Sequence, residues 1–234
     1  MESGDVELRA QMDYPQIMRI LLASSNEHKR HEISQLFAPH EILLPKDLGL
    51  EFDCEENGET FLDNAMIKAN ALFDVAKHMN IPVMADDSGL IVPALPGLLG
   101  VRTARFGSED GGPLLSAHEK NQLLLKMLKD KPDSERTAFF VCSIVLMMDR
   151  YTVYCAVEHA DGHILHEEVQ GNGGFGYDPV FYCNAAGCSM ATLPDGQKNL
   201  YSHRGKAARS RRRPRSTPTD AISRKPPPRA NWIP

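Results

Sequence analysis

The chain alternates short apolar runs with polar segments, and this pattern predicts strands that are followed by helices. Residues 18–23 form a short apolar run of the kind found in buried strands. Polar residues end the run, and residues 27–37 then carry apolar positions at helical spacing. Residues 81–85 form another such run, and Thr60 has the residue type of an N-cap for a long helix to about residue 79. A strand, a loop and a helix in this order open an α/β fold.

The second half of the chain changes to β-rich patterning. A helical pattern at residues 114–128 comes first, and β-forming runs follow at 137–148, 151–159 and 163–169. Asp149-Arg150 and Asp161-Gly162 separate these runs, and Asp-Gly is a common tight-turn pair, so the runs predict an antiparallel meander. We therefore expect an α/β fold with a mixed sheet.

Charge divides the chain into a body and a tail. Residues 207–234 hold eight basic residues against the single acid Asp220, a net charge of +7. The whole chain has a net charge of -5, so residues 1–206 carry -12. Such a basic, proline-rich tail buries too little apolar surface to fold, so we expect it to be disordered. We expect residues 1–17 to be a poorly ordered extension and residues 18–206 to be the functional domain.

Several classes of protein are excluded by composition. No apolar run approaches the roughly 20 residues that span a bilayer, and the acidic first residues lack the order of a secretory signal. The five cysteines form no C-x-x-C pair, so we expect free thiols and a cytoplasmic protein. The acidic body argues against general nucleic-acid binding, which leaves the tail as the one segment suited to it.

A polar cluster follows the first predicted strand. Its residues are Ser24, Ser25, Asn26, Glu27, His28 and Lys29. Amide groups at a helix N-terminus attract anions, and Lys29 adds a full positive charge, so a phosphate group is one interpretation. An ordinary N-cap loop with a surface lysine is the other.

Acidic and basic residues gather at the next two elements. Asn64 and Lys68 are four residues apart on the predicted long helix, after the acidic segment that begins at Glu55. Asp86 and Asp87 follow the apolar run at 81–85, where two adjacent carboxylates require a cation or hydrogen-bond donors. Asp87 is a candidate ligand for Mg²⁺ and a candidate base toward water. A simple Asp-Ser-Gly turn is the alternative.

Two further clusters lie near the end of the body. Residues 171–179 hold four glycines, which permit close approach of the backbone to a ligand. Phe175 and Tyr177 in this loop are suited to stacking on a flat ring, and Asp178 is suited to accepting a hydrogen bond from its edge. The last cluster is polycationic and contains Lys198, followed by residues 202–206.

In this order, the motifs resemble those of the inosine/xanthosine triphosphate pyrophosphatases, the Ham1-like family. The resemblance covers roughly residues 20–206. Its motifs are S-x-N-x-x-K from Ser24, E-x-x-G-x-T-F-x-x-N-A-x-x-K-A from Glu55, A-D-D-S-G-L from Ala85, P-G-x-x-x-V-R-T-A-R-F from Pro96, G-x-G-G-F-G-Y-D-P-x-F from Gly171 and S-H-R-G-K-A from Ser202. Each motif is ordinary alone, and the ordered set is specific.

The resemblance implies an elongated α/β fold with two lobes around a central nucleotide-binding cleft, usually in a homodimer. It also implies hydrolysis of ITP, dITP and XTP to the monophosphate and pyrophosphate with Mg²⁺, which keeps deaminated purines out of DNA and RNA. Asp87 would be the base and a metal ligand, Glu55 the second acidic ligand and Asp86 a supporting one. Lys68 would add catalytic positive charge.

The resemblance also assigns the nucleotide contacts. Ser24 to Lys29 would bind the triphosphate. The nucleoside would contact Ser88, Phe175, Gly176, Tyr177, Asp178, Lys198, His203 and Arg204. Donors on His203 and Arg204 would suit a 6-oxo purine, whereas a 6-amino group would present a donor to donors.

Two departures from the family pattern stand out. The opening loop has Ser24-Ser25 where Thr-Gly is common, and His28 where Gly is frequent. After Ser202 to Ala207 the family continues into an amphipathic helix, whereas this chain enters its basic tail. The tail is either a functional basic arm or the product of a changed reading frame near Ala208.

Two other functions compete with the leading one. The first is a pyrophosphatase for other modified nucleotides on the same fold. The second is a non-catalytic nucleotide sensor or nucleic-acid-binding protein that acts through the basic tail.

Overall fold

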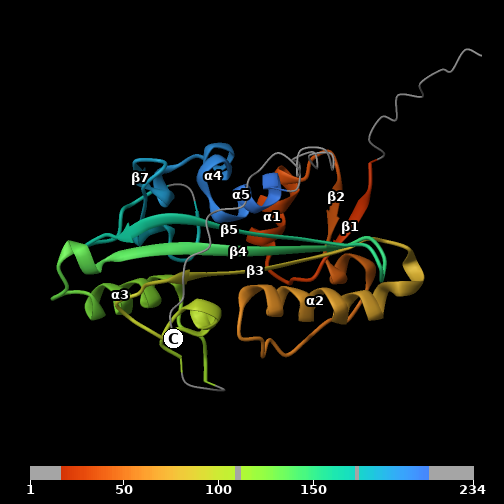
Figure 1. The fold of residues 1–234 in the computed structure, drawn as a ribbon, viewed down its shortest axis with the longest axis horizontal. Coiled ribbons are helices and arrows are strands. Elements are labelled where there is room, and N and C mark those ends of the chain that lie inside the picture. The colour runs from red at the N-terminus through yellow and green to blue at the C-terminus, as the bar shows by residue number, and fades with distance from the viewer. Residues whose placement is uncertain (1–16, 109–111, 172–173, 211–234) are drawn as a thin grey trace, which may run out of the picture.

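A computed structural model describes residues 17–108, 112–171 and 174–210 (Figure 1). The strands are β1 Arg19–Leu22, β2 Glu41–Leu43, β3 Val83–Ile91, β4 Thr137–Met147, β5 Val153–Ile164, β6 Phe181–Cys183 and β7 Cys188–Ser189. The α-helices are α1 Glu27–Leu36, α2 Phe61–Ala76, α3 Ala117–Met127, α4 Asp195–Tyr201 and α5 His203–Ser210. Short 3-10 helices are η1 Pro45–Leu48, η2 Lys77–Met79, η3 Gly100–Arg105, η4 Asp133–Glu135, η5 Asp178–Val180 and η6 Met190–Thr192.

One mixed sheet organises the molecule. Its strand order is β2-β1-β3-β4-β5-β6-β7, with β1 parallel to β2 and β3 and the remaining neighbours antiparallel. Figure 1 shows α1, α4 and α5 on one side of the long strands and α2 and α3 on the other. The predicted elongated α/β fold with a mixed sheet is therefore confirmed.

Side-chain caps fix where the helices around the site begin. Asn26 caps α1, accepting hydrogen bonds from the amides of His28 and Lys29. Thr60 caps α2 in a capping box with Asp63, which confirms the predicted N-cap. The predicted helix to about residue 79 is an α-helix to Ala76 that continues as η2.

Three apolar clusters divide the core. One lies between the sheet and α1 and α5, and includes Ile33 and Ala207. A second lies between the sheet and α2 and includes Leu72. The third joins α3, through Leu124, to β6 and the end of β3. Strands β3 and β4 both contribute to all three clusters, so these two long strands join the parts of the core.

The course of strand β5 differs from the predicted meander. The prediction of a turn at Asp161-Gly162 is wrong, because β5 continues through both residues, and Gly162 pairs with Ala138 of β4 and Cys183 of β6. A Cβ atom at position 162 would lie 2.0 Å from the carbonyl oxygen of Tyr182. Glycine is needed there for close packing of the backbones rather than for a turn.

Helix α5 corrects the boundary of the tail. Residues 207–210, assigned to the tail from composition, complete α5, and Ala207 and Ala208 are buried against the sheet. Arg209 donates hydrogen bonds to the carbonyl groups of Asn199 and Leu200, which links α5 to α4. The predictions for residues 1–16 and 211–234 fall outside the described residues. No helix in the described part of the chain is long and apolar enough to cross a membrane.

Candidate active site

A cleft of about 760 Å³ opens along β3. It is lined by the loop after β1, by α2, by η3 and α3, by the glycine-rich loop before η5, and by α4 and α5. The predicted site residues that line it are Ser24, Ser25, Asn26, Lys29, Lys68, Asp86, Asp87, Ser88, Phe175, Gly176, Tyr177, Asp178, Lys198, His203 and Arg204. Glu27, His28 and Glu55 were also predicted but do not line the cleft.

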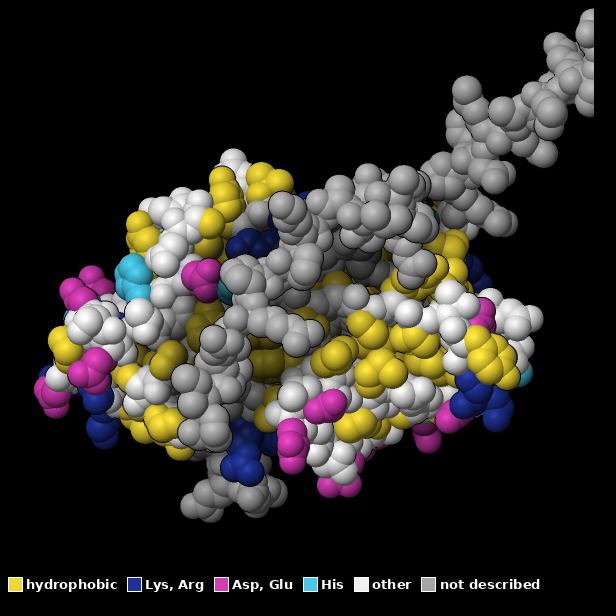
Figure 2. All heavy atoms as spheres, viewed as in Figure 1, with side chains coloured by type: hydrophobic (Ala, Val, Ile, Leu, Met, Phe, Trp, Pro, Cys, Tyr) yellow, Lys and Arg dark blue, Asp and Glu magenta, His cyan; other side chains and the backbone are white. Residues whose placement is uncertain are grey.

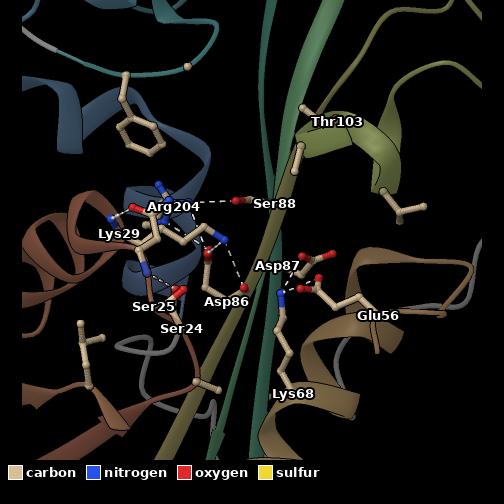
Figure 3. A pocket seen from close by; sticks show the side chains of 18 of the residues that line it. Ser24, Ser25, Lys29, Glu56, Lys68, Asp86, Asp87, Ser88, Thr103 and Arg204 are labelled. Atoms are coloured by element: carbon tan, nitrogen blue, oxygen red, sulfur yellow. Dashed lines mark hydrogen bonds and ion pairs between the residues drawn. The ribbon is translucent and has the colours of Figure 1, made fainter. Parts of the chain in front are cut away.

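Asp86 and Asp87 lie inside β3 and not at its end, which corrects the sequence prediction. Successive side chains of a strand point to opposite faces of its sheet. Figure 3 shows the result: Lys29 and Arg204 surround Asp86 on one side of the strand, and Lys68 and Glu56 surround Asp87 on the other. Asp86 and Asp87 therefore face different groups, and the supporting metal role expected for Asp86 stays a prediction.

Asp87 forms a buried ion pair with Lys68. Lys68 Nζ lies 2.8 Å from Asp87 Oδ1 and 3.0 Å from Glu56 Oε2. Burial raises the pKa of Asp87, and the positive charges of Lys68 and Lys29 offset this only in part. Burial lowers the pKa of Lys68, but Asp87 and Glu56 outweigh that effect and leave it raised. A carboxylate with a raised pKa is a stronger base than an ordinary aspartate.

Asp86 is fixed by cations on the opposite face. Lys29 Nζ lies 2.6 Å from its Oδ1, and Arg204 Nε lies 3.2 Å from its Oδ2. The thiol of Cys142 also donates to Oδ2, at 3.0 Å. Burial alone would raise the pKa of Asp86, but Arg204 and Lys29 hold it well below its usual range. Asp86 is therefore a permanent anion that orients two cations of the cleft.

The residues of the first polar cluster, Ser24 to Lys29, lie partly at the cleft and partly at the surface. Lys29 reaches the cleft, whereas Glu27 pairs with Lys46 and Arg30 at the surface. Because Asn26 Oδ1 accepts from the His28 and Lys29 amides at 2.9 and 3.2 Å, an incoming phosphate would compete with this cap. The ring of His28 stacks on Phe175, with 5.5 Å between the centroids.

A buried ion network fixes the other end of the cleft. Lys198 Nζ lies 2.8 Å from Asp178 Oδ2 and 2.6 Å from Glu32 Oε1. Glu32 also pairs with Arg204, which in turn donates a hydrogen bond to Ser88 Oγ at 2.9 Å. These acids and bases connect the glycine-rich loop to the Asp86 side of β3.

Aromatic groups and a neutral histidine complete this end. The ammonium of Lys198 lies 4.7 Å from the centre of the Phe175 ring, and Tyr177 donates a hydrogen bond to the carbonyl oxygen of Thr103 at 2.9 Å. His203 stacks on Phe140, and burial and the nearby Arg204 lower its pKa well below the usual value. His203 Nδ1 is buried and has no hydrogen-bond partner among the described residues. A neutral imidazole is thus presented at the cleft.

Sequence reasoning missed three polar residues of the site. Glu32 falls on a helix face that looks exposed in sequence, but it neutralises Lys198 and Arg204, which are 166 and 172 residues away in the chain. Glu56 pairs with Lys68 and lines the cleft, whereas Glu55, the expected metal ligand, does not line it. Asn121 of α3 donates a hydrogen bond to the carbonyl oxygen of Gly176. No local signal identifies Glu32 and Asn121, because each acts on a distant element.

The carboxylates of Asp87 and Glu56 are suited to provide part of the ligand set of a hard cation. Among the described residues, no group of three or more His, Cys, Asp or Glu side chains is arranged to hold a metal ion. However, Asp87 and Glu56 both approach the same Lys68 nitrogen and offer only oxygen donors. Mg²⁺ typically takes one or two carboxylates and completes its shell with water and substrate phosphates, so these residues fit a cation that arrives with a nucleotide.

Known proteins share both the sequence and the fold. The sequence profile of the Ham1 family matches residues 20–213. A dITP/XTP pyrophosphatase from Treponema denticola is 46% identical over 192 residues, which cover 81% of this chain and 94% of that protein. A dITP/XTP pyrophosphatase from Legionella pneumophila is 40% identical, over 80% of this chain and 93% of that protein.

Solved structures of other proteins have a similar fold. A HAM1 protein from Coxiella burnetii superposes with a TM-score of 0.68 at 35% identity, over 83% of this chain and 96% of that chain. The Ham1 protein of Staphylococcus aureus gives a TM-score of 0.66 at 34% identity, over 81% and 93% of the two chains. The motifs, the mixed sheet and the cleft thus agree with the profile and with these relatives: the chain belongs to the Ham1 family.

Proposed function

We propose that this protein hydrolyses deaminated purine nucleoside triphosphates, namely ITP, dITP and XTP, to the monophosphate and pyrophosphate. The observation that carries the proposal is the buried Asp87–Lys68 pair in a cleft whose other end holds Phe175 and the Lys198 network. The names of the dITP/XTP pyrophosphatases that it resembles support the same reaction. Its role would be to keep deaminated nucleotides from polymerases.

The chemistry follows from which groups surround Asp87. Asp87 accepts a proton from a water molecule, which attacks the α-phosphorus, and pyrophosphate leaves with the electrons of the broken P–O bond. Lys29 and Lys68 stabilise the negative charge that develops on the phosphate oxygens. A divalent cation, which we propose is Mg²⁺ held by Asp87 and Glu56, would supply further charge neutralisation. Glu55 is the alternative ligand that the family resemblance indicates.

Base selection is assigned to the opposite end of the cleft. We propose that the purine stacks on Phe175 and that Lys198, His203 and Arg204 face its 6-position. Arg204 can only donate hydrogen bonds, and Lys198 is a cation held by two carboxylates, so both suit a 6-oxo group. A 6-amino group would present its own donors to these donors, which can reduce kcat/KM by orders of magnitude.

Analysis of the products tests the reaction directly. Incubation with ITP and Mg²⁺ should yield IMP and pyrophosphate in equal amounts. Release of IDP and orthophosphate would contradict attack at the α-phosphorus. A panel of nucleotides, scored for pyrophosphate release, separates ITP, dITP and XTP from other modified nucleotides, which are the substrates of the competing pyrophosphatase function.

The competing function, nucleic-acid binding through the basic tail, is tested by deleting the tail. If the tail recruits nucleic acid, binding to RNA or DNA should weaken steeply with salt and vanish when residues 211–234 are deleted. Deletion from residue 211 keeps all of the described part of α5, His203–Ser210. We expect the truncated chain to hydrolyse ITP at the full rate. A truncated chain that loses only nucleic-acid binding would establish a second role for the tail.

We also propose that the protein is a cytoplasmic homodimer. All five cysteines are free, as expected in a reducing compartment. Val153 and Val157 lie on the same face of β5 and are 37% and 51% exposed. Figure 2 shows hydrophobic side chains gathered where the central strands lie above α2. A second copy of the chain would bury such a surface, so Val157→Asp should convert a dimer to a monomer in sedimentation measurements.

A further inference from the structure

Phe175, the proposed platform for the base, sits between two flexible residues. Gly174 and Gly176 flank it, and both have positive φ values, 80° and 64°. Glycine restricts the backbone least of all residues. The orientation of the Phe175 ring therefore depends on what holds the peptide groups on either side of it.

Hydrogen bonds hold both sides, and the carbonyl oxygen of Phe175 itself accepts from the amide of Asp178 at 3.3 Å. On the N-terminal side, the amide of Phe175 donates to Asp178 Oδ2 at 2.7 Å. On the C-terminal side, Asn121 Nδ2 donates to the carbonyl oxygen of Gly176 at 3.1 Å. The first bond lies within the loop, whereas the second comes from α3, 55 residues earlier in the chain.

The side chain of Asn121 is polar and buried, which costs free energy of folding. It is 2% exposed and shares the buried face of α3 with Leu124. Its Oδ1 atom is buried and has no hydrogen-bond partner among the described residues. A buried polar group destabilises a fold unless its hydrogen bonds compensate, so an apolar residue would serve stability better at this point. The contact with Gly176 is the gain that can offset this cost.

We propose that Asn121 is a positioning residue for the base: it ties the glycine-rich loop to α3 and so orients Phe175 for stacking on the purine. This inference rests on the proposed function, because it assigns the residue a part in binding that substrate. It predicts a defect in nucleotide binding without a defect in folding or in binding of the phosphate groups alone.

The test compares Asn121→Leu with the wild type. The leucine variant removes the hydrogen bond and fills the buried position, so its thermal stability should equal or exceed that of the wild type. KM for ITP should rise roughly three- to tenfold, as expected for loss of one hydrogen bond, and kcat should stay within about twofold. Inhibition by tripolyphosphate, which has no base, should be unchanged.

Leu124→Val is the matched control, since it loosens the same buried face of α3 and leaves the Asn121–Gly176 hydrogen bond in place. It should lower thermal stability and leave KM for ITP unchanged. The inference is overturned if Asn121→Leu leaves KM unchanged, or if KM and the tripolyphosphate inhibition constant rise together. If the wild type releases no pyrophosphate from ITP, the proposed function fails instead. Calorimetric binding of IMP then tests the positioning role, and equal affinities for the wild type and Asn121→Leu would reject it.

Discussion

Lys68 and Asp87 face each other between α2 and β3, with 2.8 Å between Nζ and Oδ1. The pair is largely buried, and Glu56 approaches the same ammonium from the loop that precedes α2. An ammonium shared by two carboxylates stays charged, so Asp87 remains next to a positive charge even though burial raises its pKa. This arrangement keeps a candidate base and a positive charge within hydrogen-bond distance of each other.

Replacing Asp87 by Asn should remove the base and preserve the shape of the site. We expect pyrophosphate release from ITP to slow by about 10²–10⁴-fold, the usual contribution of a general base. Lys68 keeps Glu56 as a partner, so the variant should fold, which circular dichroism can verify. Turnover near the wild-type rate would assign the base to another residue.

Glu55→Gln and Glu56→Gln distinguish the two candidate partners of Asp87. Glu56 lines the cleft beside Lys68, so its variant should raise the Mg²⁺ concentration needed for half-maximal turnover, by roughly tenfold or more if a ligand is lost. Glu55 does not line the cleft, and its variant should titrate with Mg²⁺ like the wild type. The reverse result would return the ligand role to Glu55, as the family resemblance indicates.

Glu32→Gln should destabilise the fold, because it leaves two buried cations with one carboxylate fewer. Breaking a buried pair costs about 3–5 kcal/mol, and the retained amide oxygen reduces the loss to about 2 kcal/mol. Chemical denaturation measures the free energy of unfolding. Glu41→Gln is the control, because the Glu41–Arg19 pair is at the surface, with side chains 57% and 53% exposed, and should contribute almost nothing.

His203 predicts a particular dependence of stability on pH. Its pKa lies well below the usual value of 6.5 in the folded protein, so the unfolded chain binds a proton first as pH falls. Stability should therefore decrease below about pH 6.5, by up to about 1.4 kcal/mol per pH unit, until the folded pKa is reached. His203→Gln should flatten this part of the curve. The exposed His78→Gln should not, and parallel curves for all three proteins would contradict the prediction.

The order of motifs was enough to predict the family and most residues of the cleft, because each motif is a local sequence. The sequence could not reveal which side chains meet across the fold. Asp86 and Asp87 read as the end of a strand because two carboxylates in a strand interior are costly. Their compensating cations, Lys29, Lys68 and Arg204, come from three other elements and are invisible to local patterns.

Gly162 shows a second limit of the same kind. The pair Asp161-Gly162 has the composition of a turn, but the glycine serves the close approach of Tyr182 in β6. A glycine in a turn and a glycine where two strands approach closely cannot be told apart in the sequence. Only the neighbouring strand distinguishes them, and it lies about twenty residues further along the chain.

The opposite orientations of Asp86 and Asp87 separate two tasks within two consecutive residues. The Asp86 side is saturated with ion pairs, whereas the Asp87 side exchanges protons and meets the reacting phosphate under the proposed function. The backbone of β3 lies between the two carboxylates, and Lys29 acts on both of them. Changes to the base-selecting residues, whether by evolution or by engineering, can thus alter which nucleotide is accepted while the Asp87–Lys68 pair is retained, provided that Lys29 stays in place.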